Sequence, residues 1–142
     1  MRTGAARLAI GAGLLGLVLV TTAGAMAFAG RGPAPATNIE IGIRYSKFEP
    51  SRIAVPVGVP VTITLRNDDP IDHEWIVGDE SVHAIHRVGT EPLHPNKPTE
   101  VVIPAGTTRT TVITFASTGS QQYICHLPGH EAYGMVGTVS IE

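Results

Sequence analysis

One short segment near the C-terminal end of the 142-residue chain holds three side chains of the kinds that bind transition metals. Cys125, His130 and Met135 offer a thiolate, an imidazole and a thioether, and four residues separate each from the next. Pro128-Gly129 between them is typical of a tight turn, so one loop can bring the three donor atoms together. This soft donor set suits copper in both of its oxidation states, whereas zinc prefers a tetrahedral set without a thioether.

Three ligands on one loop leave a coordination position open, so a fourth is expected from elsewhere in the chain. The best candidate is a histidine that begins an apolar segment directly after the turn at 67–70. The predicted ligands of one mononuclear copper ion are therefore His73, Cys125, His130 and Met135. The first three would form a trigonal plane and the thioether a weak axial bond, as in blue-copper electron-transfer sites.

Other kinds of copper site need residues that this chain lacks. Cys125 is its only cysteine, so neither an intramolecular disulfide nor a dinuclear copper site with two cysteines can form. The trinuclear cluster of multicopper oxidases needs His-x-His pairs, and the chain has none. In those oxidases a histidine precedes the cysteine, but here Ile124 does. Oxidase activity is therefore not expected, and we predict a metal-binding or electron-transfer protein rather than an enzyme.

The elements that must position these residues are predicted to be short strands. Apolar and polar residues alternate in runs that end at Gly, Pro or Asp, which is typical of strands separated by turns. The predicted strands are 38–45, 52–55, 59–67, 72–77, 100–103, 107–116, 121–125 and 134–141. No amphipathic helix longer than two turns is convincing. The predicted fold class is all-β, a Greek-key antiparallel β-sandwich.

The stretch from Gly78 to Pro98 is predicted to be a loop-rich excursion, because it is polar and only weakly periodic. It contains His83, His86 and His94, which could bind a second metal ion. The alternative, which we favour, is a solvated loop with scattered histidines. His126 follows the cysteine ligand and should point away from the copper, because neighbours on a strand face opposite sides. We expect it at the surface.

The sequence resembles the cupredoxins, the group that contains plastocyanin-like and halocyanin-like proteins, from roughly residue 39 to residue 141. The matching pieces are Phe48-x-Pro50 with the segment 53–61, Asn67 with His73, and Tyr123-x-Cys125-x4-His130-x4-Met135-x-Gly137. The resemblance implies a type 1 copper centre and one-electron transfer. Glu74 departs from the family, in which a neutral polar residue often follows the histidine ligand. The resemblance therefore does not predict which side chains contact the ligands or what reduction potential they set.

The N-terminus differs in character from the rest of the chain. Two arginines, an apolar run at 8–20 and the ending Ala27-Phe28-Ala29 predict a secretory signal peptide over residues 1–29, cleaved after Ala29. The alternative is an uncleaved membrane anchor, because residues 8–29 carry no charge and could just span a bilayer. Residues 30–37 form a Gly/Pro/Ala linker, and 38–142 the copper-binding domain. In both cases the domain would be extracytoplasmic, in the periplasm, in the cell envelope or secreted.

These features predict an exported, monomeric one-electron carrier that exchanges electrons with a redox protein. The exposed edge of the His130 ring would be the point of transfer, through a small transient interface. The predicted docking edge around it consists of Leu127, Pro128, Ala132 and Tyr133. Two alternatives remain open, a copper-handling protein of the cell envelope and an accessory copper subunit of a membrane oxidoreductase. With a formal net charge of -2 and no basic patch, nucleic acid is not an expected partner.

Overall fold

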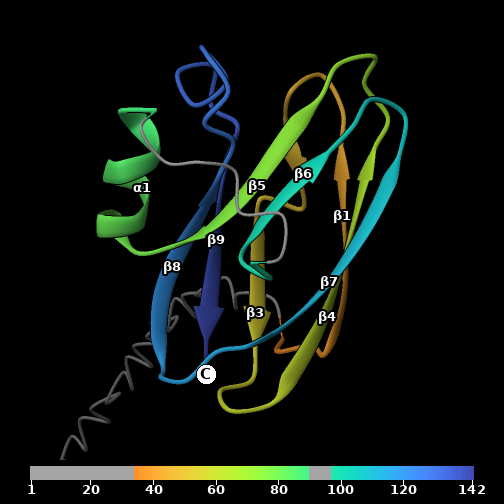
Figure 1. Ribbon diagram of the computed structural model, residues 1–142. Helices are drawn as coiled ribbons and strands as arrows, with labels where there is room; N and C mark the ends of the chain where they lie inside the picture. The colour runs from red at the N-terminus through yellow and green to blue at the C-terminus, as the bar shows by residue number, and fades with distance from the viewer. Residues whose placement is uncertain (1–33, 90–96) are drawn as a thin grey trace, which may run out of the picture. The chain divides into compact units, whose positions relative to one another are not determined.

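Two β-sheets pack against each other in the computed structural model, which describes residues 34–89 and 97–142 (Figure 1). The elements are β1 (Asn38–Ile43), β2 (Phe48–Glu49), β3 (Arg52–Val55), β4 (Pro60–Asn67), β5 (His73–Gly78), α1 (Glu80–Arg87), β6 (Glu100–Ile103), β7 (Thr108–Thr114), β8 (Gly119–Ile124) and β9 (Val136–Ile141). One sheet has the strand order β2-β1-β4-β7, and the other has the order β3-β9-β8-β5-β6. The all-β sandwich predicted from the sequence is confirmed.

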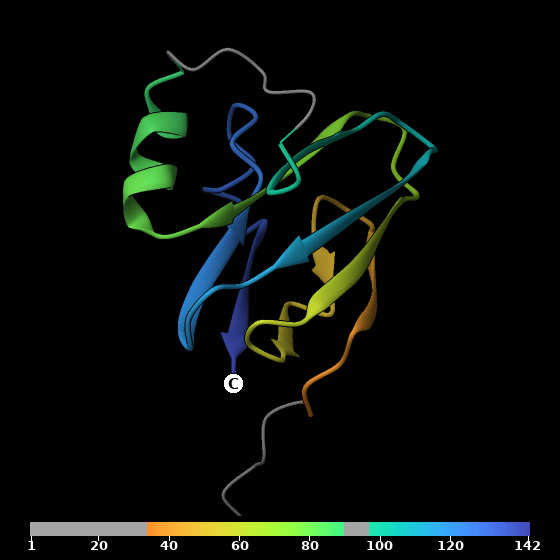
Figure 2. The ribbon, with the colours of Figure 1, turned by 60° about the horizontal axis from the view of Figure 1, so that its bottom comes forward.

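Both sheets are mixed, because two of the strand pairs are parallel. β1 runs parallel to β4, and β3 runs parallel to β9. The other pairs are antiparallel. The chain passes from one sheet to the other between β2 and β3, and β3 then lies along the last strand (Figure 2). The early strand β3 and the last strand β9 are therefore hydrogen-bonded neighbours in one sheet.

The alternating apolar residues of the strands form the core between the sheets. Ile41 and Ile43 of β1 and the odd-numbered residues 61–65 of β4 are fully buried, as their period of two requires. The strand predicted over 38–45 ends at Ile43, and Tyr45 is 79% exposed, because the chain turns after β1 and the tyrosine has a φ of 55°. Periodicity therefore predicted the core face of β1 but extended the strand too far.

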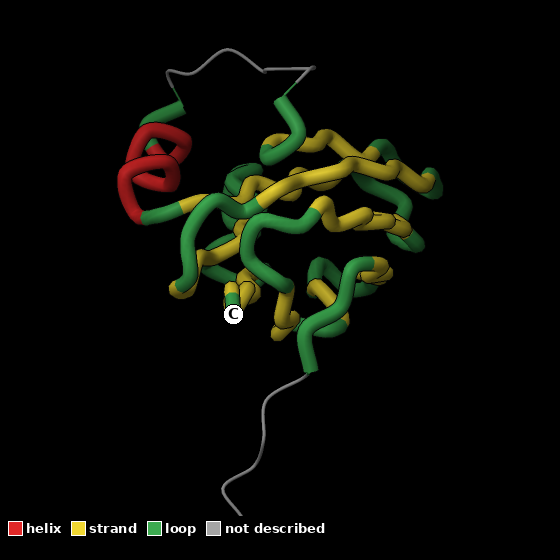
Figure 3. The backbone as a smooth tube through the Cα atoms, turned by 90° about the horizontal axis from the view of Figure 1, so that it is seen from below, coloured by secondary structure: helices red, strands yellow, loops and turns green. Residues whose placement is uncertain are grey.

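The segment 78–98 contains a helix, which differs from the loop predicted there. Asp79 caps the N-terminus of α1, and its carboxylate accepts hydrogen bonds from the N–H groups of Ser81 and Val82. The helix lies to one side of the sandwich, beside β5 (Figure 3). The helix could not be predicted from apolar periodicity, because the fully buried side chain on its inner face is His83 rather than an apolar residue.

The predicted signal peptide or anchor over residues 1–29 lies outside the described residues, as do residues 30–33 of the linker. His94 of the predicted excursion also lies outside them. Within the described parts of the chain, the one helix is too short and too polar to cross a membrane.

Candidate metal centre

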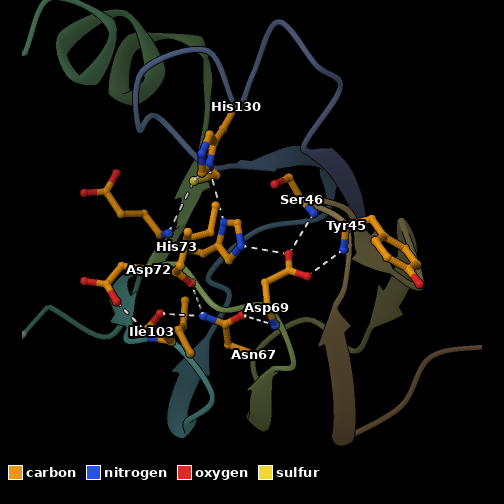
Figure 4. Close-up of polar contacts among 12 residues, drawn as sticks. Tyr45, Ser46, Asn67, Asp69, Asp72, His73, Ile103 and His130 are labelled. Atoms are coloured by element: carbon orange, nitrogen blue, oxygen red, sulfur yellow. Dashed lines mark hydrogen bonds and ion pairs between the residues drawn. The ribbon is translucent and has the colours of Figure 1, made fainter.

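Three of the four predicted ligands meet at one end of the sandwich. His73 begins β5, Cys125 directly follows β8, and His130 comes from the loop that joins β8 to β9. Their donor atoms all lie within 4.8 Å of one another. Nδ1 of His130 is 3.2 Å from Nδ1 of His73 and also 3.2 Å from Sγ of Cys125. Figure 4 shows the two histidine rings approaching each other from the strand and the loop.

The strand order explains this convergence. β5 and β8 are antiparallel neighbours, and Ile76 pairs with Ile124. The start of β5 and the end of β8 therefore lie at the same end of the sheet, which places His73 beside Cys125. The backbone N–H of Glu74 donates a hydrogen bond to Sγ of Cys125 over 3.3 Å, which fixes the position of the sulfur.

The ligand loop, residues 125–135, is closed by its own backbone hydrogen bonds. The N–H of Met135 donates to the carbonyl of His130 over 3.0 Å, and the N–H of Cys125 donates to the carbonyl of Met135 over 3.2 Å. Gly129 and Gly134 have φ values of 85° and 84°, a left-handed conformation that glycine adopts without strain. Met135 is fully buried in the same cluster of core residues as Cys125. The loop thus holds all three of its predicted ligands at the end of the core.

Asp69 holds the far side of the His73 ring. Its Oδ2 lies 3.0 Å from Nε2 of His73, and its carboxylate also accepts hydrogen bonds from the N–H groups of Tyr45 and Ser46, at 2.7 and 2.8 Å (Figure 4). Burial alone would raise the pKa of Asp69, but these hydrogen bonds outweigh it and lower the pKa. The carboxylate is therefore ionised and accepts the Nε2 proton. When His73 is neutral, its lone pair is then on Nδ1, which faces the other donor atoms.

Asp69 is a residue whose role the sequence did not reveal, because it lies in the turn at 67–70, where aspartate is common for local reasons. The turn is organised by Asn67, whose side-chain amide donates to the carbonyls of Ile71 and Ile103 at 2.8 and 3.0 Å. Oδ1 of Asn67 accepts from the N–H of Asp69 over 3.0 Å. An acidic residue four positions before a histidine ligand, in a turn that begins with asparagine, is the signal that could have identified it.

The protonation chemistry of the other donors also suits a metal. Burial raises the pKa of the Cys125 thiol, which favours the neutral thiol until a cation stabilises the thiolate. Burial, together with the neighbouring His73, lowers the pKa of His130, so its imidazole is neutral near pH 7. One thiolate and two imidazoles beside a buried thioether form a soft donor set. This set fits copper, the cofactor predicted from the sequence.

The predicted second site is only partly described, because His94 lies outside the described residues. His83 and His86 are both on α1, and each lies against His126 rather than in a solvated loop. The prediction that His126 lies at the surface is wrong, because its side chain is only 3% exposed. Burial lowers the pKa of His126 to about 4. The sequence could not reveal this burial, since it depends on a helix that was not predicted.

The predicted docking edge lies on the same loop as His130. Pro128, Ala132 and Tyr133 are exposed, and the Tyr133 side chain is 73% accessible. Leu127 is partly buried and packs against the core. Nζ of Lys47 contacts the carbonyl oxygen of Tyr133, so a charged side chain borders this apolar surface.

Comparison with known sequences matches residues 14–138 to the family described as "Cupredoxin-like domain". The chain is 31% identical over 98 residues to the copper-resistant cuproprotein CopI of Rubrivivax gelatinosus. That alignment covers 67% of this chain but 59% of the relative, so the chain spans less than two thirds of its length. A second protein of that name, from Pseudomonas aeruginosa, is 24% identical over 138 residues, which cover 74% of this chain and 76% of the relative.

Solved structures with the same fold include auracyanins. The dithionite-reduced auracyanin of Roseiflexus castenholzii has a TM-score of 0.66 at 23% identity, covering 77% of this chain and 99% of that one. Auracyanin A of Chloroflexus aurantiacus, described as a blue copper protein, has a TM-score of 0.58 at 25% identity, covering 78% of this chain and all of that one. The sandwich, the converging donor atoms and the family match lead to one conclusion: this chain belongs to the cupredoxin-like family.

Proposed function

We propose that this protein carries single electrons in an extracytoplasmic compartment, through one copper ion bound by His73, Cys125, His130 and Met135. The proposal rests on the observation that hydrogen bonds within the protein hold two of the ligands in place. The ring of His73 is held by Asp69, and the sulfur of Cys125 by the N–H of Glu74. Ligands held in this way change position little between Cu(I) and Cu(II), which favours rapid electron transfer.

The surroundings of His130 support electron exchange with another protein. Its ring is half-buried, whereas His73 and Cys125 are fully buried, so it is the ligand nearest to solvent among these three. The exposed loop residues Pro128, Ala132 and Tyr133 would form an apolar contact surface around it. A small apolar surface suits a short-lived complex with a redox partner.

A second candidate function is copper handling, in which the protein delivers or buffers the ion. The name of the two CopI relatives, copper-resistant cuproprotein, favours it. The same four ligands would serve, but the ion would leave the site as part of the function. The two functions therefore differ in whether reduced copper stays bound.

Voltammetry of the purified copper-loaded protein in the presence of a Cu(I) chelator separates these functions. An electron carrier is expected to give a reversible one-electron wave that persists over repeated cycles, because Cu(I) stays in the site. If reduction instead releases the metal to the chelator and the wave collapses, the electron-carrier proposal fails and copper handling is supported.

The carboxylate of Asp69 is expected to lower the reduction potential of the copper. In Asp69→Asn a neutral amide replaces the anion beside His73, which removes a charge that favours Cu(II) over Cu(I). We expect the potential to rise by about 60 mV, corresponding to a tenfold change in the relative affinity for the two oxidation states. Voltammetry measures the shift. Asp68→Asn is the matched control, because Asp68 pairs with Arg66 at the surface. Equal shifts in both variants would contradict a specific role for Asp69.

A further inference from the structure

Two buried histidines, His83 of α1 and His126 of the ligand loop, face each other beside the end of β8. Nδ1 of His83 lies 3.0 Å from Nε2 of His126. The other nitrogen of each ring is directed at an oxygen atom. Nε2 of His83 is 3.3 Å from the carbonyl oxygen of Gln122, and Nδ1 of His126 is 3.4 Å from Oε2 of Glu131. The two remaining nitrogens therefore converge on one point.

A hydrogen bond between two neutral rings does not satisfy this arrangement. The carbonyl of Gln122 can only accept, so the proton of neutral His83 belongs on Nε2, and its Nδ1 carries a lone pair. If His126 donates from Nε2, its Nδ1 carries a lone pair that faces the carboxylate of Glu131. This nitrogen is buried, and the oxygen atom that faces it, Oε2 of Glu131, lies 3.4 Å away. Leaving it unpaired beside an anion is unfavourable.

The other tautomer of His126 places a proton on Nδ1, toward Glu131. Arg87 fixes that carboxylate, because its Nε and Nη2 donate to Oε1 at 3.0 and 2.8 Å. Nε2 of His126 then carries a lone pair, and it lies opposite the lone pair of His83. Two lone pairs 3.0 Å apart repel each other unless a proton or a metal cation lies between them.

We propose that Nδ1 of His83 and Nε2 of His126 bind a second metal ion, separate from the copper bound through Cys125. With the metal bound, Oε2 of Glu131, which lies 3.4 Å from Nδ1 of His126, would accept the Nδ1 proton and orient the ring, the usual role of a carboxylate behind a metal-bound histidine. The copper centre has the same pattern, with Asp69 behind His73. This site goes beyond the proposed electron-transfer function, which needs only one metal ion.

The donor atoms and their spacing identify the class of ion. Imidazole nitrogen suits Cu(II), Zn(II) and Ni(II), whereas Mg(II) and Ca(II) prefer oxygen. With metal–nitrogen bonds of about 2.0–2.1 Å, the 3.0 Å separation gives an angle of about 95° at the metal. This is closer to the right angle of tetragonal Cu(II) than to a tetrahedral angle. The ring of His86 stacks on His126 at an interplanar angle of 10° and encloses the site on that side.

The test uses the full-length protein with its Cys125 site already filled, as judged by the thiolate-to-copper absorption band. Further Cu(II) is added, and binding is followed by calorimetry and by electron paramagnetic resonance. We expect one more equivalent to bind, with the wide hyperfine splitting of tetragonal copper, while the absorption band is unchanged. If no second equivalent binds, the proposal is overturned, and the unchanged band shows that the first site is intact.

Variants assign the ligands. His83→Gln and His126→Gln are each expected to weaken the second site by more than about 100-fold, and Glu131→Gln by about 10-fold, the effect typical of a residue behind a ligand. His94→Gln is the control and should bind the second ion normally. Retention of the ion in both His83→Gln and His126→Gln, or its loss in His94→Gln alone, would overturn the assignment.

A measurement on the unmodified protein avoids any dependence on how the variants fold. Nitrogen-15 spectra of the histidine rings can be recorded on the Cu(I) protein, with Zn(II) as a diamagnetic probe. Zn(II) should shift the unprotonated nitrogens, Nδ1 of His83 and Nε2 of His126, and leave their partner nitrogens protonated. Ring nitrogens that do not respond to Zn(II) would overturn the proposal.

Discussion

Cys125→Ser is expected to abolish the intense visible absorption band of the Cu(II) protein. The band arises from charge transfer between thiolate and copper, and the chain has no other cysteine that could supply a thiolate. A serine hydroxyl is a hard, weakly acidic ligand, so the affinity for Cu(I) should also fall by more than about 100-fold. Absorption and electron paramagnetic resonance spectra of both proteins, loaded with Cu(II), measure the loss of the band and of the narrow hyperfine splitting.

Met135→Leu is the matched comparison within the same loop. The thioether is expected to be only a weak axial ligand, so this variant should keep the absorption band while its reduction potential changes. Leucine also preserves the apolar volume at a fully buried position. A band that survives in Cys125→Ser, or one that disappears equally in both variants, would contradict the assignment of the thiolate as the dominant ligand.

Gly137→Ala is expected to cause the largest loss of stability from a single methyl group. Gly137 of β9 pairs with Tyr123 of β8, and the tyrosine ring lies over its backbone. A Cβ atom at position 137 would lie 2.1 Å from the ring atoms of this fully buried side chain. The ring cannot move easily, because its hydroxyl donates to the carbonyl of Pro50 over 2.7 Å. We expect the free energy of unfolding to fall by about 3 kcal/mol, measured by urea denaturation.

Gly42→Ala separates this steric clash from the general effect of replacing a strand glycine. Gly42 lies in β1, and a Cβ atom there would have no neighbour closer than 3.7 Å. Its replacement should therefore change stability by less than about 1 kcal/mol. Tyr123→Leu should also lower the free energy of unfolding by less in the Gly137→Ala background than in the unmodified protein, because the two changes share one contact. Equal losses in Gly42→Ala and Gly137→Ala would refute the clash.

Much of this structure could be predicted from local patterns in the sequence. The period of two identified eight of the nine strands within residues 34–89 and 97–142, and the buried residues of β4 are those that alternation placed on one face. The grouping of His73, Cys125 and His130 followed from ligand chemistry and from the expectation that strand ends meet. Their convergence needed only that β5 and β8 be neighbours, which a sandwich of short strands favours.

The remaining features depend on partners that are distant in sequence. Periodicity carries no information on whether β1 pairs with β4 or in which direction. The helix α1 buries a histidine that contacts another histidine on the ligand loop, so its sequence has no apolar stripe to reveal it. Asp69 was interpreted as a turn residue because its local sequence is that of a turn. Its contact with His73 is made only when the turn is folded.

The two ring nitrogens that approach each other at the copper centre belong to residues 57 positions apart in the chain. A copper ion held by both would act as a covalent staple does, since it would close a long loop in any partly unfolded state. In the chain-entropy treatment of cross-links, closing a loop of this length lowers the entropy of the unfolded chain and raises its free energy by about 4 kcal/mol. The single cysteine rules out an internal disulfide, and the metal would take over that role. Loss of copper would then leave the protein more open to proteolysis.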